Sequence, residues 1–437
     1  MEADEIVSIL HVDEAEVYKI EKEILTVRIA DKHVIETKGI RDDGVAIRIV
    51  KDKRINGIKI SSDKTSLRDI DIKGERHEEW KGLPATSNVK PFNGYDKALD
   101  DLSIEDYLEI SKSMLNHANK FKLDNFSGSI HLIKERVELT NSNGVNLNDK
   151  ATYILTNINA DKDNVSGVGF SSSRTLNRFD YLDAVEYASQ MAIRSLNAKR
   201  CDEDYYSIIF EPYALAELLS FVFAYNFNSK MYREKRSCLY NRLDEQIASE
   251  ILTVYDDGRI EDGLGSKAFD DEGLETKRTP LIEDGIFKNI IYDTFYACKD
   301  SRESTANGLR VGYPVGRASE PSITPSMHNI VIKEGEYSKE EMIKDTRKGL
   351  LVGRLWYTYP VNPEQGDFSC TARSGIFLIE NGEIKHPCKM VRIIDNLKRF
   401  MLNISAISKE RKQVLQWHAI PCVASYIKVD KIRAIPI

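Results

Sequence analysis

The pattern that most restricts the fold of this chain is an alternation of apolar and charged residues between Val17 and Ile60. Apolar side chains stand at every second position in places, as at Val45, Ile47 and Ile49. Successive side chains of a strand point to opposite faces, so this spacing is typical of strands with one buried face. The segment predicts antiparallel strands with one solvated side, joined by turns at Asp31-Lys32, Asp42-Asp43-Gly44 and Asn56-Gly57.

Helical and strand-like segments then follow one another. Ser103-Ile104-Glu105-Asp106 resembles a helix cap, and the apolar residues from Tyr107 to Ala118 repeat at helical spacing. A second helical period extends from Tyr181 to Leu196. Between the two predicted helices, the turn sequence Asn141-Ser142-Asn143-Gly144 separates two strand-like segments, Ser129 to Thr140 and Ala151 to Ala160.

A polar run from Lys199 to Tyr205 marks a candidate domain boundary. An apolar strand, Ser207 to Phe210, and a buried helix at about 212–227 follow it, and further strands are expected from about residue 328. The predicted fold class is α+β. We expect an N-terminal α/β domain with an antiparallel sheet and helices at residues 1–200, and a β-rich C-terminal domain with a buried helix at residues 205–437.

Composition excludes several classes of protein. The 62 Lys and Arg against 69 Asp and Glu give a net charge of −7, which offers no electrostatic case for direct nucleic-acid binding. The longest apolar stretch, Tyr206 to Phe227, contains Glu211, Pro212 and Glu217, so no membrane span is expected. The six cysteines form no CxxC pair and the N-terminus lacks a signal-like apolar region, which indicates a reduced, cytoplasmic protein.

Metal-binding motifs are incomplete. His77-Glu78-Glu79-Trp80 begins like a zincin motif, but Lys81 stands where the second histidine is needed, so a surface loop is the better interpretation. None of the eight histidines lies between His131 and His328. In the acidic middle of the chain, Arg259 interrupts the alternate oxygen ligands of a calcium loop. The glycines that end Asp256-Asp257-Gly258, Glu261-Asp262-Gly263 and Asp270-Asp271-Glu272-Gly273 favour structural turns.

No catalytic constellation is evident from residue spacing. Ser369 has no nearby histidine, and its surroundings do not match a nucleophile elbow. Cys370 lacks a neighbouring histidine or helix start that would lower its pKa, which favours a buried structural thiol. We therefore assign no catalytic residue and no metal ligand, and keep an independent hydrolase based on Cys370 or the Asp-rich loops as a remaining alternative.

A series of ordered motifs nevertheless resembles one family, the TldD/PmbA family, over nearly the whole chain. The motifs are Asp256-Asp257-Gly258, Asp270-Asp271-Glu272-Gly273, Arg278-Thr279-Pro280-Leu281-Ile282-Glu283-Asp284-Gly285, Ser304-Thr305-Ala306-Asn307-Gly308 with Arg310, Asn362-Pro363-Glu364-Gln365-Gly366-Asp367-Phe368-Ser369 and Ile394-Asp395-Asn396-Leu397. The resemblance implies a metallopeptidase family, also described as modulators of DNA gyrase, in which two subunit types pair as a heterodimer. TldD-type subunits carry HExxxH on the helix after the first C-terminal strand and a downstream cysteine, and PmbA/TldE-type subunits lack these ligands.

The corresponding helix here, Glu211 to Phe223, contains no histidine, although Cys422 lies near the position of the family's cysteine. The chain therefore resembles a PmbA/TldE-type subunit without a metal of its own, inactive alone, and a TldD-like partner is expected to supply zinc or iron. The implied role is proteolysis of unfolded peptides, with Asn307, Arg310, Asp367 and Ser369 as candidate substrate-binding residues. The alternative is a homodimeric, non-catalytic binding module such as a regulator of DNA gyrase.

Overall fold

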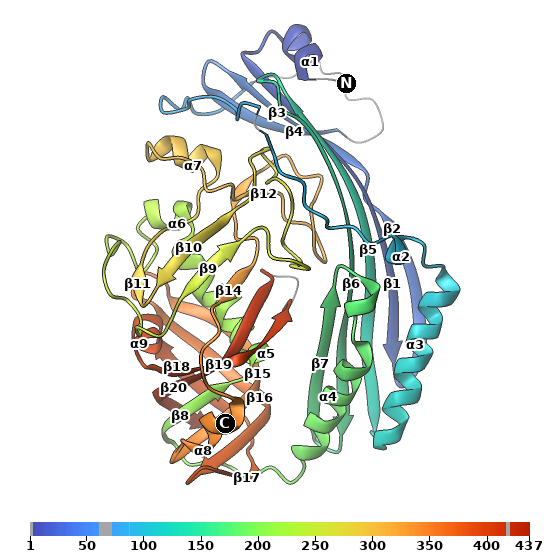
Figure 1. The fold of residues 1–437 in the computed structure, drawn as a ribbon, viewed down its shortest axis with the longest axis vertical. Coiled ribbons are helices and arrows are strands. Elements are labelled where there is room, and N and C mark those ends of the chain that lie inside the picture. The colour runs from blue at the N-terminus through green and yellow to red at the C-terminus, as the bar shows by residue number, and fades with distance from the viewer. Residues whose placement is uncertain (1–2, 61–71, 87, 417–419) are drawn as a thin grey trace.

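Two large sheets, each built from a different half of the chain, lie side by side (Figure 1). The computed structural model describes residues 3–60, 72–86, 88–416 and 420–437. Strands before residue 174 form one sheet, and the strands after residue 203, apart from one short two-stranded ribbon, form the other. The predicted α+β fold, with helices on an antiparallel N-terminal sheet and a β-rich C-terminal part, is confirmed.

The N-terminal sheet is antiparallel throughout, with strand order β4-β3-β1-β5-β6-β7 and with β2 paired to the far end of β1. After helix α1 (Ala3–Leu10), its strands are β1 (Glu14–Ala30), β2 (His33–Arg41), β3 (Gly44–Lys51), β4 (Arg54–Ile60), β5 (Asn125–Asn141), β6 (Asn146–Lys162) and β7 (Val165–Ser173). The hairpin turn predicted at Asn141 to Gly144 joins β5 to β6.

One predicted turn is wrong. Asn56-Gly57 lies inside β4, and the chain reverses instead at Asp52-Lys53, where φ is 49° and 62°. A two-residue hairpin turn with positive φ at both residues, as here, fits the right-handed twist of the two strands that it joins. Gly57 is needed for space, since an added Cβ would lie 2.8 Å from Cβ of Pro321.

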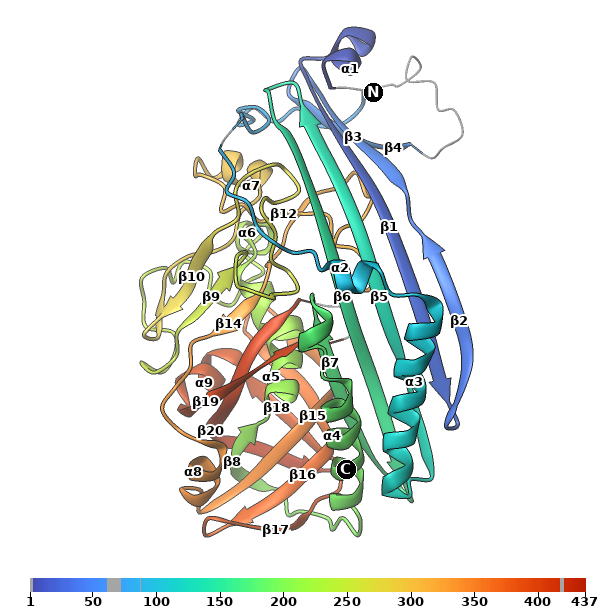
Figure 2. The ribbon, with the colours of Figure 1, turned by 45° about the vertical axis from the view of Figure 1, so that its right-hand side comes forward.

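Helices cover one face of the lower half of this sheet (Figure 2). They are α2 (Lys97–Asp100), α3 (Ile104–Ala118) and α4 (Tyr181–Arg194). The predicted cap of α3 is confirmed as a capping box between Ser103 and Asp106. Apolar residues of β1, β5 and β6, such as Val27 and Ile130, pack against Tyr107 of α3 and Ala188 of α4.

The C-terminal sheet has eleven strands and is mixed, with β8–β15 and β14–β20 parallel. Its strands are β8 (Asp204–Phe210), β9 (Val254–Asp257), β10 (Arg278–Glu283), β11 (Ile286–Phe287), β14 (Ile330–Ile332), β15 (Lys348–Asn362), β16 (Asp367–Glu380), β17 (Glu383–Pro387), β18 (Val391–Asn396), β19 (Ile404–Val414) and β20 (Cys422–Pro436). A short ribbon consists of β12 (Gly308–Leu309) and β13 (Thr324–Pro325). The helices are α5 (Pro212–Leu218), α6 (Ser229–Arg233), α7 (Thr294–Lys299), α8 (Lys339–Lys344) and α9 (Leu397–Leu402).

Helix α5 occupies the centre of the C-terminal core, and every one of its residues is buried. It begins with Pro212 at its first turn, a position where the missing N–H costs nothing. The helix continues as a π turn at Leu219–Phe223 and a 3₁₀ turn at Ala224–Phe227. The predicted buried helix at about 212–227 is therefore present as three successive helical segments.

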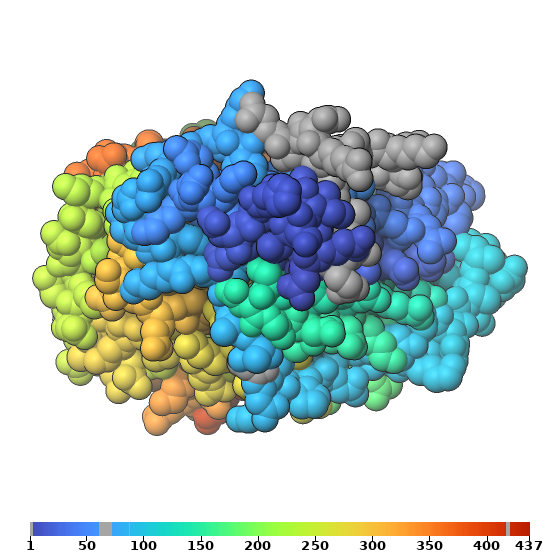
Figure 3. All heavy atoms as spheres, turned by 90° about the horizontal axis from the view of Figure 1, so that it is seen from above, coloured from blue at the N-terminus to red at the C-terminus, as the bar shows by residue number. Residues whose placement is uncertain are grey.

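The two sheets are held together along their length. From above, the N-terminal segments lie against the yellow and orange segments of the C-terminal half (Figure 3). Mixed clusters join the halves, as where Tyr18 and Leu139 pack with Phe269. Among the helices of the described ranges, none has the length and apolar character needed to cross a bilayer.

Candidate functional site

A groove with a volume of about 620 Å³ lies between the two domains. We call it the interdomain groove. One wall comes from β1, β5 and β6. Along these strands, side chains that face the groove alternate with side chains that pack on α3 and α4. Tyr213 of α5 and Arg354 of β15 belong to the opposite wall. The polar residues of the first wall are Thr26, Arg28, Ser127, Ser129, His131, Asn157 and Asn159.

This wall is polar and well ordered by its own hydrogen bonds. The His131 ring lies between two hydroxyls, with Nδ1 2.9 Å from Oγ1 of Thr26 and Nε2 3.0 Å from Oγ of Ser129. Across the groove, the rings of Phe170 and Tyr213 stack with centroids 3.6 Å apart, which ties β7 to α5. Hydroxyl and amide groups at strand spacing suit a ligand with an extended, polar backbone.

Helix α5 places Tyr213 and Glu217 on the same face, four residues apart. Glu217 is 2% exposed, and its charge acts with burial to raise the pKa of both the Tyr213 hydroxyl and the Cys370 thiol. Glu211, just before the helix, accepts a hydrogen bond from the hydroxyl of Tyr187 on α4. Burial raises the pKa of Glu211 to about 7.

The donor groups around α5 do not fit the metal site that the family resemblance implies. The Cys422 sulfur lies 3.9 Å from the carbonyl oxygen of Ala216 and 3.7 Å from Oγ of Ser220, beside Glu217 in the chain. Burial raises the pKa of the Cys422 thiol to about 12. The helix offers no imidazole, and within the described ranges no group of three or more His, Cys, Asp or Glu is arranged to hold a metal.

Asn307, one of the candidate substrate-binding residues, is fully buried in the loop structure of the C-terminal domain. Its Nδ2 donates to Oδ2 of Asp256 at 2.6 Å and to the carbonyl of Ser326 at 2.9 Å. Oδ1 of Asp256 accepts in turn from the backbone N–H groups of His328 and Asn329. Burial raises the pKa of Asp256 to about 7 despite these donors. The Asp256-Asp257-Gly258 motif therefore organises loops, as its turn chemistry predicts.

Arg310, the second candidate, lies in a buried ionic network between the two domains. Its guanidinium contacts Oε1 of Glu16 at 2.7 Å and the carbonyl of Asp271, and it stacks over the Tyr18 ring at 4.3 Å. The same network continues through Arg48, which bridges Glu16 and Glu272 at 2.6 Å each. The Asp270-Asp271-Glu272-Gly273 motif thus fastens the C-terminal loops to the N-terminal sheet.

The N-terminal members of this network, Glu16, Arg48 and Glu135, were not predicted from the sequence. All three are buried, and Arg48 lies in the segment from Val17 to Ile60 that was predicted to have one solvated side. Arg317 reaches Oε1 of Glu135 at 3.4 Å and Oδ1 of Asp271 at 2.9 Å. Charged residues at alternate strand positions normally indicate exposure, so no local signal distinguished these residues from surface ones.

Asp367 and Ser369 lie apart from that network, at the start of β16. Oδ1 of Asp367 accepts from Nδ2 of Asn396 at 2.8 Å. Ser369 is 2% exposed, and its hydroxyl has no hydrogen-bond partner among the described residues. The four candidates therefore form two separate pairs, and none of them is among the residues that line the interdomain groove. Their role in substrate binding stays a prediction.

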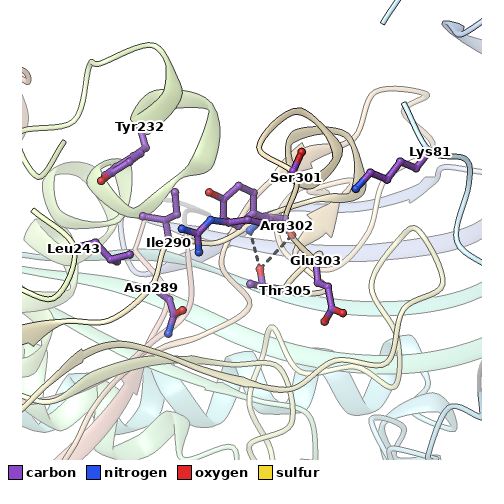
Figure 4. Close-up of a pocket in the computed structure, with 10 residues that line it drawn as sticks. Lys81, Tyr232, Leu243, Asn289, Ile290, Ser301, Arg302, Glu303 and Thr305 are labelled. Carbon is purple, nitrogen blue, oxygen red and sulfur yellow. Dashed lines mark hydrogen bonds between the residues drawn. The ribbon is translucent and has the colours of Figure 1, made fainter. Parts of the chain in front are cut away.

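Two further features are alternatives to the groove. Cys370 is fully buried and its thiol has a raised pKa, which supports a structural thiol rather than a nucleophile. A second pocket, of about 440 Å³, lies on the C-terminal domain (Figure 4). The exposed side chains of Lys81 and Arg302 line it with Tyr232, and it contains none of the four candidates.

Solved structures share this fold. TldE from Thermococcus kodakarensis matches with a TM-score of 0.87 and 24% identity, over 99% of this chain and 98% of that one. A Thermotoga maritima protein, titled as a proposed modulator of a DNA gyrase, matches with a TM-score of 0.84 and 18% identity, over 99% and 98% of the two chains. At these identities the matches show the fold alone.

Sequence comparison extends this similarity to curated proteins. A metalloprotease of Methanocaldococcus jannaschii is 28% identical over 254 residues, which span 58% of this chain and 53% of that protein, about half its length. Residues 97–196 match the PmbA/TldA metallopeptidase central domain, and residues 203–435 match the PmbA/TldA metallopeptidase C-terminal domain. Since the C-terminal match alone covers more than half of the sequence, the chain belongs to the PmbA/TldD family of metallopeptidases.

Proposed function

We propose that this chain is a non-metal-binding, PmbA/TldE-like subunit of a two-chain metallopeptidase. The observation that carries the proposal is the set of donor groups at α5: the helix presents Glu217 and no imidazole, and Cys422 of β20 is the thiol beside it. One carboxylate and one thiol do not assemble a peptidase metal centre, which needs three protein ligands and an open position. The metal, zinc or iron, and the activated water would then belong to a TldD-like partner.

The role of this chain in such a complex is to enclose and align an unfolded peptide in the interdomain groove. Among the described strands, β2 pairs with β1 alone. It is largely exposed and contributes Glu36, Lys38 and Ile40 to the groove. An extended peptide adding to β2 would gain backbone hydrogen bonds without depending on its sequence. In this proposal Asn307 and Arg310 hold the loops that join the domains. Asp367, partly exposed at the start of β16 and outside the groove, remains a candidate substrate contact, whereas Ser369 is too buried to touch a substrate in this structure.

Metal content and peptidase activity test the proposal. The full chain would be purified alone and after co-expression with the TldD-like chain of the same organism, and zinc and iron would be measured by mass spectrometry. We expect substoichiometric metal and no cleavage of unfolded peptides for the chain alone, and a chelator-sensitive activity for the complex. Stoichiometric metal with peptidase activity in the isolated chain would overturn the proposal.

The second candidate function is a homodimeric binding module, for example one that regulates DNA gyrase. A stripe of exposed apolar side chains on β15, formed by Tyr357, Tyr359 and Val361, favours association with another protein under either hypothesis. Native mass measurement after affinity purification distinguishes the two. A TldD-like chain in the complex supports the first function, and a homodimer that retains gyrase supports the second.

A further inference from the structure

Two thiols from distant parts of the sequence meet beside the connection between the domains. Cys201 lies in the segment that leads from α4 to β8, and Cys388 lies between β17 and β18. A parallel bridge joins the two segments, with the backbone N–H of Lys199 donating to Pro387 at 3.0 Å and that of Lys389 donating to Lys199 at 2.8 Å. The Cys388 thiol is hydrogen bonded to the Cys201 sulfur. The backbone bridge thus holds the segment of Cys201 beside the segment of Cys388.

A cavity gives access to Cys388, one member of this pair. It has a volume of about 520 Å³ and lies between Ser166 of the N-terminal sheet and Ser374 of β16, with Cys388 in its lining. The other cysteines of the C-terminal core differ in this respect. Cys370 and Cys422 are fully buried, and burial raises the pKa of each, which leaves them as unreactive thiols.

The electrostatic coupling of the pair favours reaction at this place. The hydrogen bond from Cys388 lowers the pKa of Cys201, and the neighbouring Cys201 raises the pKa of Cys388. The pair therefore releases one proton more easily than an isolated thiol and keeps the second, so that one negative charge is shared by two sulfurs. A thiolate with an adjacent resolving thiol is the arrangement that thiol–disulfide exchange requires.

We infer that Cys201 and Cys388 form a modification site that exchanges with low-molecular-weight disulfides through the cavity beside Cys388. The Cys201 thiolate takes the proton of Cys388 as the Cys388 sulfur attacks one sulfur of the reagent, a mixed disulfide forms, and the first reagent thiolate leaves and takes that proton from Cys201. The Cys201 thiolate then attacks the Cys388 sulfur and expels the second reagent thiolate, which is protonated by solvent. Two protein thiols are oxidised to one disulfide, and the reagent disulfide is reduced to two thiols.

The disulfide would fasten the domain connection to the C-terminal sheet. At the same place the hydroxyls of Ser166 and Ser374 already join the domains, 3.2 Å apart. A covalent link here restricts separation of the two sheets and therefore the width of the interdomain groove. Oxidation would also protect the segment between α4 and β8 from proteolysis.

The experiment uses the full chain and glutathione disulfide, followed by alkylation and non-reducing peptide mapping. We expect the cross-linked Cys201–Cys388 peptides to form before Cys370 or Cys422 reacts, to disappear on reduction, and to slow cleavage in the connection by about tenfold or more. In Cys201→Ser, which lacks the resolving thiol, a stable glutathione adduct should remain on Cys388.

Two results would overturn the inference. One is a wild-type chain in which glutathione stays as a mixed disulfide or in which other cysteines react first. The other is a Cys201–Cys388 disulfide that leaves the cleavage rate of the connection unchanged, which would contradict its effect on the domains. Neither result depends on a partner subunit or on peptidase activity, so the inference is tested independently of the proposed function.

Discussion

Arg310 makes four polar contacts while only 1% of its surface is exposed. It connects the ribbon strand β12 to Glu16 in the N-terminal sheet, so one side chain links both domains. Removing one partner of a buried ion pair leaves the other charge without compensation, which costs far more than an exposed pair contributes. At the residue scale, buried charge decides how the halves of the molecule meet.

Arg310→Met should therefore lower the free energy of unfolding by about 3–5 kcal/mol, because Glu16 loses a buried partner. Arg302→Met, at an exposed arginine nearby in the chain, is the matched control and should change stability by less than about 0.5 kcal/mol. Urea denaturation followed by circular dichroism gives both values. Equal effects of the two substitutions would show that Arg310 is not part of a structural network.

Glu211→Gln tests the buried carboxyl at the start of α5. The Glu211 carboxyl keeps its proton in the folded chain up to about pH 7, whereas its ordinary pKa is 4.5. Between pH 4.5 and 7 the native state therefore binds more protons than the unfolded state. The free energy of unfolding therefore falls as pH rises from about 4.5 to 7. The amide keeps an acceptor for Tyr187 and has no charge to bury.

We expect Glu211→Gln to exceed the wild type in stability by up to about 3 kcal/mol above pH 7, and to match it below pH 4.5. Thermal or urea unfolding of both proteins at each pH isolates this group from Asp256 and Asp293, whose raised pKa values of about 7 and about 8 affect both proteins alike. A stability difference that is constant with pH would contradict the assignment.

At the element scale, the turn at Gly273 lets the acidic loop approach the N-terminal sheet. Its φ is 91°, and an added Cβ would lie 2.9 Å from Cγ1 of Val145 and 3.2 Å from Cδ2 of Leu139. Gly74 has a φ of 120° with nothing within 4 Å of the added Cβ, so it is a control for backbone strain alone. Comparing an alanine substitution at Gly273 with one at Gly74 therefore separates the cost of a strained backbone from the cost of overpacking.

Gly273→Ala should destabilise the protein by about 1–3 kcal/mol more than Gly74→Ala does, because only the first substitution overpacks the contact between domains. Differential scanning calorimetry of the two variants provides the comparison. If both lost the same stability, the loop would have room to move away from β5 and the contact would not be rigid.

The strands that the sequence predicts well are those with strict alternation and strong turns, such as β5 and β6 around Asn141 to Gly144. The wrong turn at Asn56-Gly57 has a tertiary cause, since Gly57 makes space for Pro321 from the other domain. The π turn after α5 was also beyond prediction from apolar spacing. Four of its five residues are apolar, so one extra residue per turn leaves no visible change in the pattern.

At the scale of the whole molecule, the exposed stripe on β15 is the surface feature that most favours a partner chain. Tyr357 is 69% exposed and has a φ of 51°, which is rare for an aromatic residue. Across the sheet, Ile394 of β18 is 50% exposed and extends the apolar surface. A strained residue kept at an exposed position is consistent with a role in binding.

Tyr357→Asn should leave the stability of the isolated chain unchanged or slightly higher, since Asn tolerates positive φ better than Tyr does. The affinity for the partner subunit should fall by about tenfold or more if the ring is buried in the interface. Surface plasmon resonance gives the affinity, with Tyr205→Asn, at an exposed tyrosine of β8, as the control. Full affinity of the Tyr357 variant would exclude this stripe from the interface.

The sequence by itself determined the α+β class, the antiparallel N-terminal sheet with its capped helix, the position of the buried helix and the absence of histidine from it. These properties follow from periodicity and residue identity, which act over a few neighbouring residues. Tertiary structure alone decided that Glu16, Arg48 and Arg310 form a buried network, that Cys201 meets Cys388, and that a groove opens beside Tyr213. Each depends on contacts between residues far apart in the chain, and a charged or thiol side chain has the same local pattern whether the other domain covers it or leaves it in water.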